Sequence, residues 1–354
     1  MPQLAGLISQ RSWRVARIVA LITMTIAGCA RDTAPPAIDL TGAGATFPYP
    51  LYRRWFADYA ARTGVRINYL SVGSAAGIRL LDSATVDFGA IDRPLTAAER
   101  GGSACPRVAI PTVAGAIAVV YNLPEQSSAL RLDADLLADI FTGVIRRWDD
   151  RAIAARNPGV ELPGRAISVV HRAPGSGTSR AFAAYLASSR KWKPRGDLEW
   201  STGVAVEGNE GVGAQVHQTV GAIGYAEVAY ATLYHLQVAL VRNAHGEDVL
   251  PSDVSIRGAV DSALVHSSAD SASLILSTAP RSYPIATLTW LVFDPGTLDA
   301  SRRAKVVSFI RWALHNGAAS ADRLEYVPLP PAAVTRYDSA LTTLSANSCH
   351  VTPP

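Results

Sequence analysis

One pattern occurs three times in this chain and constrains its fold more than any other feature: a short strand-like segment, a turn rich in Gly, Ser or Thr, and then a helical segment. The three turns lie within residues 41–48, 73–77 and 171–179. After the first turn, Leu51, Trp55 and Tyr59 recur at helical intervals. Strands that alternate with helices in this way are typical of α/β architecture, so we expect an α/β fold.

The hydrophobic spacing also predicts where the elements around these turns lie. Gly64 suits the end of the first helix because glycine adopts left-handed backbone angles without strain. The expected elements, in chain order, are a helix from about Pro48–Pro50 to Gly64, a strand over Val65–Tyr69, a short helix with Ile78, Leu80 and Leu81, a buried strand over Val86–Ile91, a strand over Ala166–Val170 and a helix with Phe182, Tyr185 and Leu186 on one face.

The three turns are candidate anion sites. A Gly- and Ser-rich turn at the start of a helix presents unpaired backbone N–H groups and a hydroxyl at the positive end of the helix dipole. One such turn is most often only an N-cap, but three in one chain, with Arg172 in one of them, predict a bound oxyanion. Without Arg11, Arg14 and Arg17 near the N-terminus the formal net charge falls from +4 to +1, so fixed dipoles rather than net charge would hold the anion.

Composition excludes several classes of protein. With 354 residues, 49% hydrophobic and 18% charged, the chain has room for about two domains and is not globally disordered. Its one continuous hydrophobic stretch, Ile18–Ala27, is too short to span a bilayer comfortably, which excludes a polytopic membrane protein. Three cysteines do not make a disulfide scaffold, and no clustered basic face indicates a nucleic-acid partner.

The first 29 residues resemble a bacterial lipoprotein signal peptide. Three arginines precede the apolar stretch, and the segment ends in Ile26–Cys29, which resembles a lipobox. In lipoproteins the thiol corresponding to Cys29 carries the lipid, and residues 30–38 would then form a tether to a bacterial membrane. An ordinary signal peptide with an incidental cysteine, or a signal-anchor helix, is the alternative.

The mature protein is therefore expected outside the cytoplasm, on the periplasmic or cell-surface face of the membrane. An oxidising compartment permits a disulfide between Cys105 and Cys349, and two separate buried thiols are the alternative.

No enzymatic motif is present in the sequence. There is no P-loop and no complete dinucleotide fingerprint, and the residues around Ser74 and Ser176 do not form a nucleophile elbow. The seven histidines show no metal-ligand spacing. We therefore expect no catalytic residues, no cofactor and no metal.

Four segments together resemble the ligand loops of bacterial phosphate-binding proteins, the extracytoplasmic receptors of phosphate ABC transporters. These segments are Thr41–Pro48, Gly73–Gly77, Val86–Asp92 and Arg172–Ser179. Flanking segments agree with the same family: Phe141–Asp149, Asn157–Gly159, Gly208–Gly211, Gly221–Tyr225, Tyr283–Ile285 and Ser308–Trp312. The resemblance covers essentially the whole mature chain in order. It is weakest over Asp253–Pro280, which we expect to be a variable segment.

The resemblance implies a two-lobed periplasmic-binding-protein fold of type 2, with the ligand in the cleft between the lobes. Lobe I would comprise residues 39–118 plus 289–354, and lobe II residues 119–288. The chain would cross the hinge near Ile117–Tyr121 and Leu288–Leu291. This second crossing would return Cys349 to the lobe of Cys105, which favours their pairing.

The same resemblance implies the residues that bind phosphate. Loops would supply hydroxyl and backbone N–H donors, and Arg172 a planar positive fork. Asp92 is the informative member, because an ionised carboxylate only accepts hydrogen bonds; it suits an anion that still bears a proton, as phosphate does, and penalises sulfate. A carboxylate that only caps its loop before Pro94 is the alternative. The implied ligand set is Thr46, Phe47, Ser74, Asp92, Arg172, Ser176, Gly177 and Thr178.

Two positions depart from the family's pattern. Pro174 stands where the family commonly has an Asp that pairs with the binding arginine, so Arg172 is expected to be oriented differently or to carry less compensated charge. Arg93 follows Asp92 where small residues are common. We expect its side chain to point to solvent, and an additional cation at the cleft is the alternative.

The sequence thus predicts a non-enzymatic, monomeric receptor, lipid-anchored on the extracytoplasmic face of a bacterial membrane. It would capture inorganic phosphate and deliver it to ABC permease subunits. The alternatives are a phosphatase built on the same fold, a receptor for another tetrahedral oxyanion, and a receptor used for sensing or adhesion without a permease.

Overall fold

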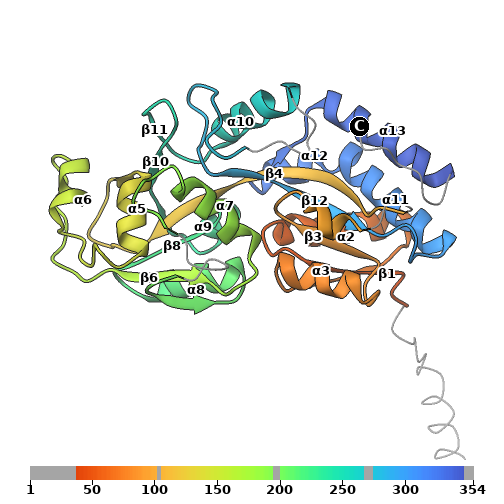
Figure 1. The fold of residues 1–354 in the computed structure, drawn as a ribbon, viewed down its shortest axis with the longest axis horizontal. Helices are drawn as coiled ribbons and strands as arrows, with labels where there is room; N and C mark the ends of the chain where they lie inside the picture. Colours follow the sequence, from red (N-terminus) through yellow and green to blue (C-terminus); the bar gives the residue numbers. More distant parts are fainter. Residues whose placement is uncertain (1–36, 102–104, 194–199, 267–273, 347–354) are drawn as a thin grey trace, which may run out of the picture. The chain divides into compact units, whose positions relative to one another are not determined.

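The computed structural model describes residues 37–101, 105–193, 200–266 and 274–346 (Figure 1). The candidate signal peptide, Cys29, most of the tether and Cys349 lie outside these residues, so the lipoprotein and the Cys105–Cys349 pairing remain predictions. Cys105 itself is disulfide-bonded, which excludes the alternative of a free thiol there. Within the described residues, no helix combines the length and the apolar character that crossing a bilayer requires.

The described residues form an α/β structure, as expected, around a ten-stranded sheet. Its order is β2-β1-β3-β12-β4-β8-β6-β7, with β9 and β13 also paired to β4. The strands are β1 (Leu40–Gly44), β2 (Ile67–Ser71), β3 (Phe88–Ile91), β4 (Val108–Tyr121), β6 (Ser168–Arg172), β7 (Val204–Val206), β8 (Ala222–Glu227), β9 (Gln237–Val238), β12 (Ala286–Phe293) and β13 (Val327–Pro328). A separate three-stranded sheet contains β5 (Arg131–Leu132), β10 (Leu240–Arg242) and β11 (Asp248–Val249).

Strand β4 links two groups of strands. It is paired with β12 over Val108–Ala116 and with β8 over Ile117–Tyr121. Figure 1 shows β4 running from the group that contains β1 and β3 to the group that contains β6 and β8. The change of partner falls at Ile117, within the segment expected to cross the hinge, and the lobe boundaries themselves remain a prediction.

Parallel pairing decides where the turns of the sequence pattern lie. Strand β1 is parallel to both β2 and β3, so the turns that follow these three strands leave the same edge of the sheet. Strand β6 is likewise parallel to β7 and β8. In open α/β sheets this edge, at the carboxyl ends of the strands, is where ligands bind.

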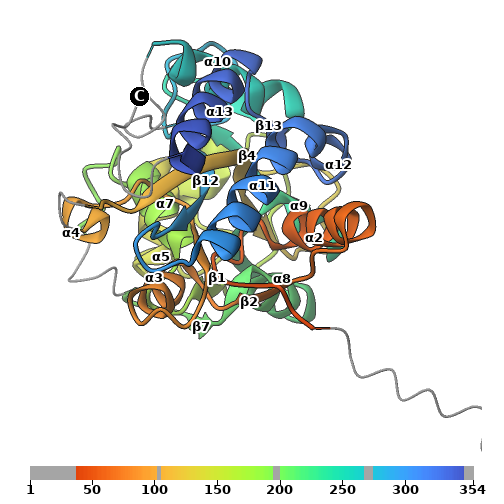
Figure 2. The same ribbon diagram turned by 90° about the vertical axis from the view of Figure 1, so that its right-hand side faces the viewer.

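Helices pack against the sheet (Figure 2). Helix α2 begins at Tyr49 and ends before Gly64, which has a φ of 77°, and its predicted apolar face is buried. The helices are α2 (Tyr49–Thr63), α3 (Ser74–Asp82), α4 (Ala97–Arg100), α5 (Ala134–Phe141), α6 (Arg151–Arg156), α7 (Gly177–Leu186), α8 (Gly208–Gln218), α9 (Val228–Leu233), α10 (Asp253–His266), α11 (Ala300–Asn316), α12 (Ala318–Arg323) and α13 (Pro331–Ala346).

The boundaries of several elements differ from those predicted. Strands β2, β3 and β6 each begin two residues later than the apolar pattern indicated. At β3 the reason is visible: Val86 is buried before the ladder begins at Phe88, so its apolar side chain reflects burial and not strand pairing. Helix α10 occupies the first half of Asp253–Pro280, where the sequence indicated only a variable segment.

Aromatic side chains form much of the core in both groups of strands. On the α2 side, the ring of Phe56 lies 5.3 Å from that of Phe309 and 5.8 Å from that of Tyr69. On the β6–β8 side, Phe182 of α7 stacks on Tyr225 of β8 with ring centroids 4.4 Å apart. Such ring packing adds about 0.5–1.5 kcal/mol per pair beyond the area buried. These contacts pack α2 and α7 against the core, directly after the turns at residues 41–48 and 171–179.

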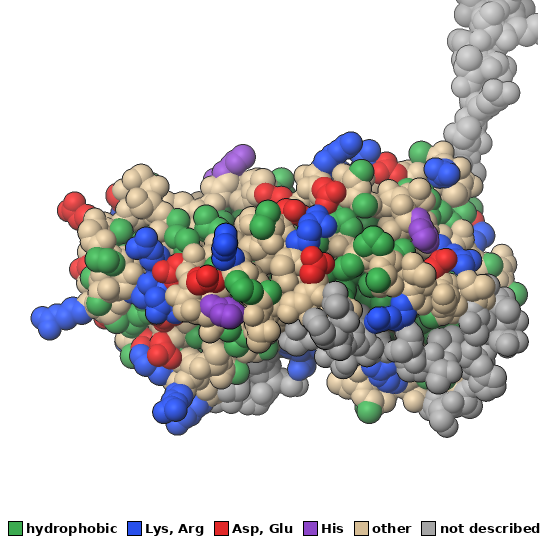
Figure 3. Space-filling model, turned by 90° about the horizontal axis from the view of Figure 1, so that it is seen from above, with side chains coloured by type: hydrophobic (Ala, Val, Ile, Leu, Met, Phe, Trp, Pro, Cys, Tyr) green, Lys and Arg blue, Asp and Glu red, His purple; other side chains and the backbone are tan. Residues whose placement is uncertain are grey.

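Charged side chains are mixed on the surface. Figure 3 shows one face of the molecule, on which Lys and Arg are interspersed with Asp and Glu. Ion pairs such as Arg107–Asp82 and Arg156–Asp133 neutralise charge locally. The face in Figure 3 therefore has no broad patch of one sign, such as a polyanion-binding protein presents.

Candidate functional site

The turns after β2, β3 and β6 meet in the structure. The hydroxyl of Ser74, at the start of α3, lies 3.4 Å from Oδ2 of Asp92. A Cβ built on Gly177, at the start of α7, would lie 2.6 Å from the Ser74 hydroxyl and 2.8 Å from Asp92 Oδ2, so only glycine fits there. The backbone N–H of Ala75 donates to the carbonyl of Gly175 at 3.1 Å, so segments 100 residues apart in sequence touch at their helix N-termini.

The turn after β1 joins the same cluster through an additional residue. The side-chain nitrogen Nδ2 of Asn209, near the start of α8, lies 2.8 Å from the hydroxyl oxygen of Thr46 and 3.3 Å from that of Thr178. Nη1 of Arg172 lies 3.4 Å from the Thr178 hydroxyl. Thr46, Thr178 and Arg172 are thus connected in one network, and all three are buried.

Each residue of the predicted ligand set lies in this cluster or directly beside it. The side chain of Phe47 is in the core, so this residue can offer only backbone groups to a ligand, and its carbonyl accepts from Tyr326 at 2.7 Å. The hydroxyl of Ser176 caps α7 by accepting from the N–H of Ser179 at 3.1 Å. That bond uses an acceptor position of Ser176 and leaves its proton free to donate.

Arg172 is a buried cation without an ion-pair partner among the described residues. It is only 4% exposed, and its Nε has no hydrogen-bond partner. Burial lowers the pKa of Arg172, while Tyr225, Asp92, Glu210 and Glu207 act on it in the opposite direction. Pro174 offers Arg172 no carboxylate. That Arg172 is therefore oriented differently, or carries less compensated charge, than in the family remains a prediction. A buried charge in this state is costly and favours an anionic ligand.

Asp92 is buried beside Arg172 with two hydroxyl partners. Its Oδ1 accepts from Thr289 at 3.0 Å and its Oδ2 from Ser74 at 3.4 Å. Burial raises the pKa of Asp92 to about 7, although the hydrogen bond from Thr289 and the charge of Arg172 pull it down. Its hydrogen-bond partners are side chains from β12 and α3, not backbone groups of its own loop, which does not support the loop-capping alternative.

Arg93 corrects an expectation. The side chain does not point freely to solvent; it forms a two-pronged ion pair with Glu99, at 2.5 and 2.7 Å, and is only 21% exposed. Glu99 also completes a capping box with Thr96 at the start of α4, which holds the pair in place. This partner, six residues along the chain, neutralises Arg93 beside the cluster and was not predicted from the sequence.

Several residues of the network were not predicted. Asn209 lies in the segment Gly208–Gly211, which resembles the family but suggested no role of its own. Tyr225 supports Arg172: its hydroxyl accepts from the backbone N–H of Arg172 at 3.1 Å and lies 2.7 Å from the Ser179 hydroxyl. Thr289 lies on a strand about 200 residues from Asp92 in sequence. No local pattern marks such partners, because tertiary pairing alone brings them to the site.

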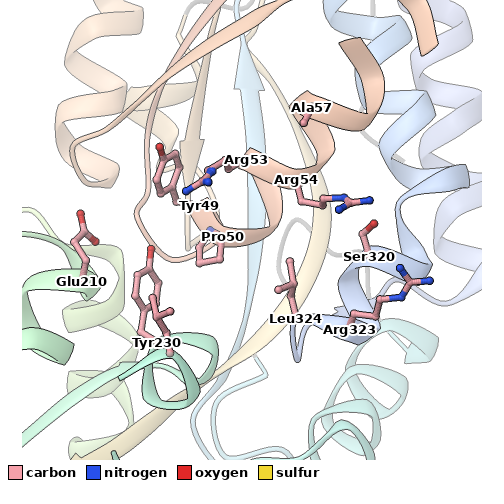
Figure 4. Close-up of a pocket in the computed structure, with 11 residues that line it drawn as sticks. Tyr49, Pro50, Arg53, Arg54, Ala57, Glu210, Tyr230, Ser320, Arg323 and Leu324 are labelled. Atoms are coloured by element: carbon pink, nitrogen blue, oxygen red, sulfur yellow. The ribbon is translucent and has the colours of Figure 1, made fainter. Parts of the chain in front are cut away.

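The cluster leaves little space. A cavity of about 10 Å³ is lined by residues 172–176 together with Ser179, Arg180 and Trp200. It has room for about one water-sized group. A much larger pocket, of about 640 Å³, lies beside the cluster between α2, α8, α9 and α12 (Figure 4). None of the predicted ligands lines it. Among the described residues no group of three or more His, Cys, Asp or Glu side chains could hold a metal ion.

A fully buried carboxyl group, Glu227, lies next to the network. Its Oε2 lies 2.8 Å from the hydroxyl oxygen of Tyr326 and accepts from the N–H of Ala229 at 2.9 Å. Burial raises the pKa of Glu227 well above its ordinary value of 4.5, and these two bonds offset only part of the rise. Glu227 therefore keeps its proton in the folded protein at a pH at which the unfolded chain has lost it.

This difference predicts a pH-dependent stability. As the pH rises above about 4.5, Glu227 alone should lower the free energy of unfolding by up to about 1.4 kcal/mol per pH unit, until its folded-state pKa is reached. Glu227→Gln removes this titration, so the variant should lose less stability than the wild type between about pH 5 and pH 8. Urea unfolding at pH 5 and at pH 8 measures this change in the free energy of unfolding. Glu125→Gln, at an exposed glutamate, is the control, and equal pH slopes for Glu227→Gln and wild type would contradict the prediction.

Hydroxyls and N–H groups surround the guanidinium of Arg172 in a buried cradle, and this cradle lies between two groups of strands in an α/β sheet. Such a site defines an anion-binding receptor of the periplasmic-binding-protein class. In agreement, the family model described as a PBP superfamily domain matches residues 30–316. The chain belongs, within this superfamily, to the phosphate-binding proteins of phosphate ABC transporters.

Individual relatives support that assignment. Phosphate-binding protein PstS of Xylella fastidiosa (strain Temecula1) is 39% identical over 324 residues, which cover 88% of each chain. The protein of the same name from Haemophilus influenzae is 37% identical and covers 86% of this chain and 92% of its own.

Solved structures share the fold. A high affinity periplasmic phosphate-binding protein (PfluDING) bound with phosphate aligns with a TM-score of 0.69 at 22% identity, over 86% of this chain and 94% of its own. A phosphate-binding protein from Stenotrophomonas maltophilia aligns with a TM-score of 0.66 at 22% identity, over 87% and 95% of the two chains.

Proposed function

We propose that this protein is an extracytoplasmic receptor that captures inorganic phosphate and delivers it to the permease of an ABC transporter. Family membership supports both the ligand and the transporter. The single observation that carries the proposal to this chain is the buried, unpaired guanidinium of Arg172, surrounded by helix N-termini and hydroxyl groups. A small oxyanion supplies the charge and the acceptors that this cluster lacks.

We propose the ligand set that the family resemblance implies, in which Phe47 would contribute backbone groups only. Arg172 would bind phosphate oxygens with its planar fork, and the hydroxyls of Thr46, Ser74 and Thr178 would donate to the ligand, as would the start of α7 at Ser176 and Gly177. The ionised Asp92 would accept a hydrogen bond from the O–H group that phosphate retains. The lobe ranges 39–118 plus 289–354 and 119–288, with the cleft between them, are part of the same proposal.

We also propose a monomer, held at the membrane by lipid on Cys29. The signal-like segment and its lipobox support the anchor. A solved phosphate-binding protein with the same fold is described as periplasmic, which supports an extracytoplasmic location. We propose no catalytic step for the cluster, because the curated relatives are named as binding proteins.

Titration calorimetry tests the ligand. At about pH 8, where Asp92 is mostly ionised, we expect one phosphate per chain, with a Kd in the micromolar range or below, about −8 kcal/mol or stronger. Sulfate should bind at least about 100-fold more weakly, because it has no proton to donate to Asp92. Comparable binding of both anions would refute the selectivity, and absence of phosphate binding would refute the proposed function.

A further inference from the structure

Asn209 contacts two hydroxyls of the proposed ligand set. It is the second residue of α8 and is fully buried. Its backbone N–H and its side-chain Nδ2 both donate to the Thr46 hydroxyl oxygen, at 3.2 and 2.8 Å, and Nδ2 also lies 3.3 Å from the hydroxyl oxygen of Thr178. Thr46 precedes Asn209 by 163 residues, and the two belong to different predicted lobes.

The orientation of the Asn209 amide follows from its remaining partner. Its Oδ1 accepts from the backbone N–H of Glu227 at 3.0 Å. A flipped amide would set its NH₂ group against that N–H donor, which would leave both unpaired in a buried place. The NH₂ group must therefore face the two threonines.

This orientation determines what the threonine hydroxyls can do. A hydroxyl has one proton to donate and two positions that accept. Thr46 accepts twice from Asn209, and Thr178 accepts from Asn209 and from Nη1 of Arg172 at 3.4 Å. Both positions that accept are filled in each hydroxyl, so the proton of each can only be donated to another acceptor.

We propose that Asn209 is a positioning residue that makes the hydroxyls of Thr46 and Thr178 obligatory donors to the bound anion. This inference rests on the proposed function, since it takes phosphate as the acceptor. Asn209 itself does not touch the ligand. Because Thr46 and Asn209 lie on different predicted lobes, the Thr46 hydroxyl acquires its donor role only when the cleft is closed.

Asp92 has the opposite hydrogen-bonding role to the two threonines. An ionised Asp92 offers only acceptor positions, so the site would present donors on one side and a single acceptor on the other. A singly protonated phosphate matches this pattern, with several acceptor oxygens and one O–H donor. Asn209 would thus contribute to selectivity without contacting the ligand.

Two substitutions with the same number of side-chain heavy atoms as asparagine separate this role from simple packing. Asn209→Asp can still accept from the N–H of Glu227, but its carboxylate also accepts from the threonine hydroxyls and turns their protons away from the anion. Asn209→Leu removes the side-chain bonds and leaves the hydroxyls free to rotate toward the ligand. At about pH 8 we expect Asn209→Asp to weaken phosphate binding by at least about 100-fold, and Asn209→Leu by less than about tenfold.

Testing Asn209→Asp in a variant without the two threonine hydroxyls shows whether it acts by turning those hydroxyls or by repelling the anion. Thr46→Val and Thr178→Val together remove both hydroxyls at nearly constant volume. If Asn209 acts through the hydroxyls, Asn209→Asp should lose most of its effect in this background, whereas repulsion between a carboxylate and the anion would persist. The four proteins of this cycle are the wild type, Asn209→Asp, Thr46→Val/Thr178→Val and the triple variant. Their phosphate affinities, measured by calorimetry, give the coupling energy between Asn209 and the two hydroxyls.

The outcomes are distinct. The inference is overturned if Asn209→Asp binds phosphate as well as Asn209→Leu, or if its effect is unchanged in the Thr46→Val/Thr178→Val background. If Asn209→Asp does not fold, the same cycle is run with Asn209→Ala, whose weaker effect must also disappear in that background; additive losses would overturn the inference. Failure of the wild-type protein to bind phosphate would instead overturn the proposed function.

Discussion

Replacing Arg172 with Ala should weaken phosphate binding by about 100-fold or more. Each charge-assisted hydrogen bond contributes about 1.5–3 kcal/mol, and a guanidinium fork makes two to a single tetrahedral anion. The structure makes the loss large, because Arg172 is 4% exposed and has no ion-pair partner among the described residues. The hydrogen bond from Thr289 and the charge of Arg172 both hold the pKa of Asp92 down, so the pKa of Asp92 should rise further in this variant.

Calorimetry with matched variants checks this expectation. Arg172→Lys keeps the charge but loses the fork, and it should bind with intermediate affinity. Arg53→Ala removes an exposed arginine from α2, which lines the separate pocket in Figure 4, and should leave the affinity unchanged. An unchanged affinity in Arg172→Ala would remove Arg172 from the site and with it the main support for the proposed function.

Asp92→Asn should reduce the preference for phosphate over sulfate by about 100-fold or more. The ionised carboxylate can only accept, so sulfate, which has no proton at neutral pH, leaves it unpaired and repelled. The amide of an asparagine can donate instead, and sulfate then finds a partner. The structure supports a direct role because Asp92 is buried, with Ser74 and the start of α7 beside its Oδ2.

The pH dependence provides an independent check of Asp92. Because the pKa of Asp92 is about 7, the carboxyl group gains a proton as the pH falls through that value and can then donate to sulfate. The phosphate preference of the wild type should therefore decline below about pH 7. Phosphate titrates in the same range, but Asp92→Asn shares that effect and serves as the control. A wild-type preference that follows the same pH curve as that of Asp92→Asn would show that Asp92 does not set the selectivity.

Several features of the site follow from local sequence. A turn of Gly with Ser or Thr, followed by apolar residues at helical spacing, identifies the starts of α2, α3 and α7. Of these three helices only α7 has a side-chain cap, from Ser176, whereas α2 and α3 follow Pro48 and Gly73 without one. The residue types in these turns are sufficient to predict an oxyanion, and the family resemblance extends this prediction to phosphate. The predicted boundaries of the strands are less accurate, since β2, β3 and β6 each begin two residues later than the sequence indicated.

Local sequence therefore specifies the chemical kind of each turn: donors at three helix starts, a cation at Arg172 and a carboxyl group at Asp92. How these groups act depends on the folded chain, which buries Asp92 and raises its pKa, pairs Arg93 with Glu99, and places Asn209 against Thr46 and Thr178. The physical reason is the separation in the sequence between the residues that interact. Capping and turn hydrogen bonds form between neighbours in the chain, whereas the burial of Asp92 and the orientation of the Thr46 hydroxyl depend on partners more than 100 residues away.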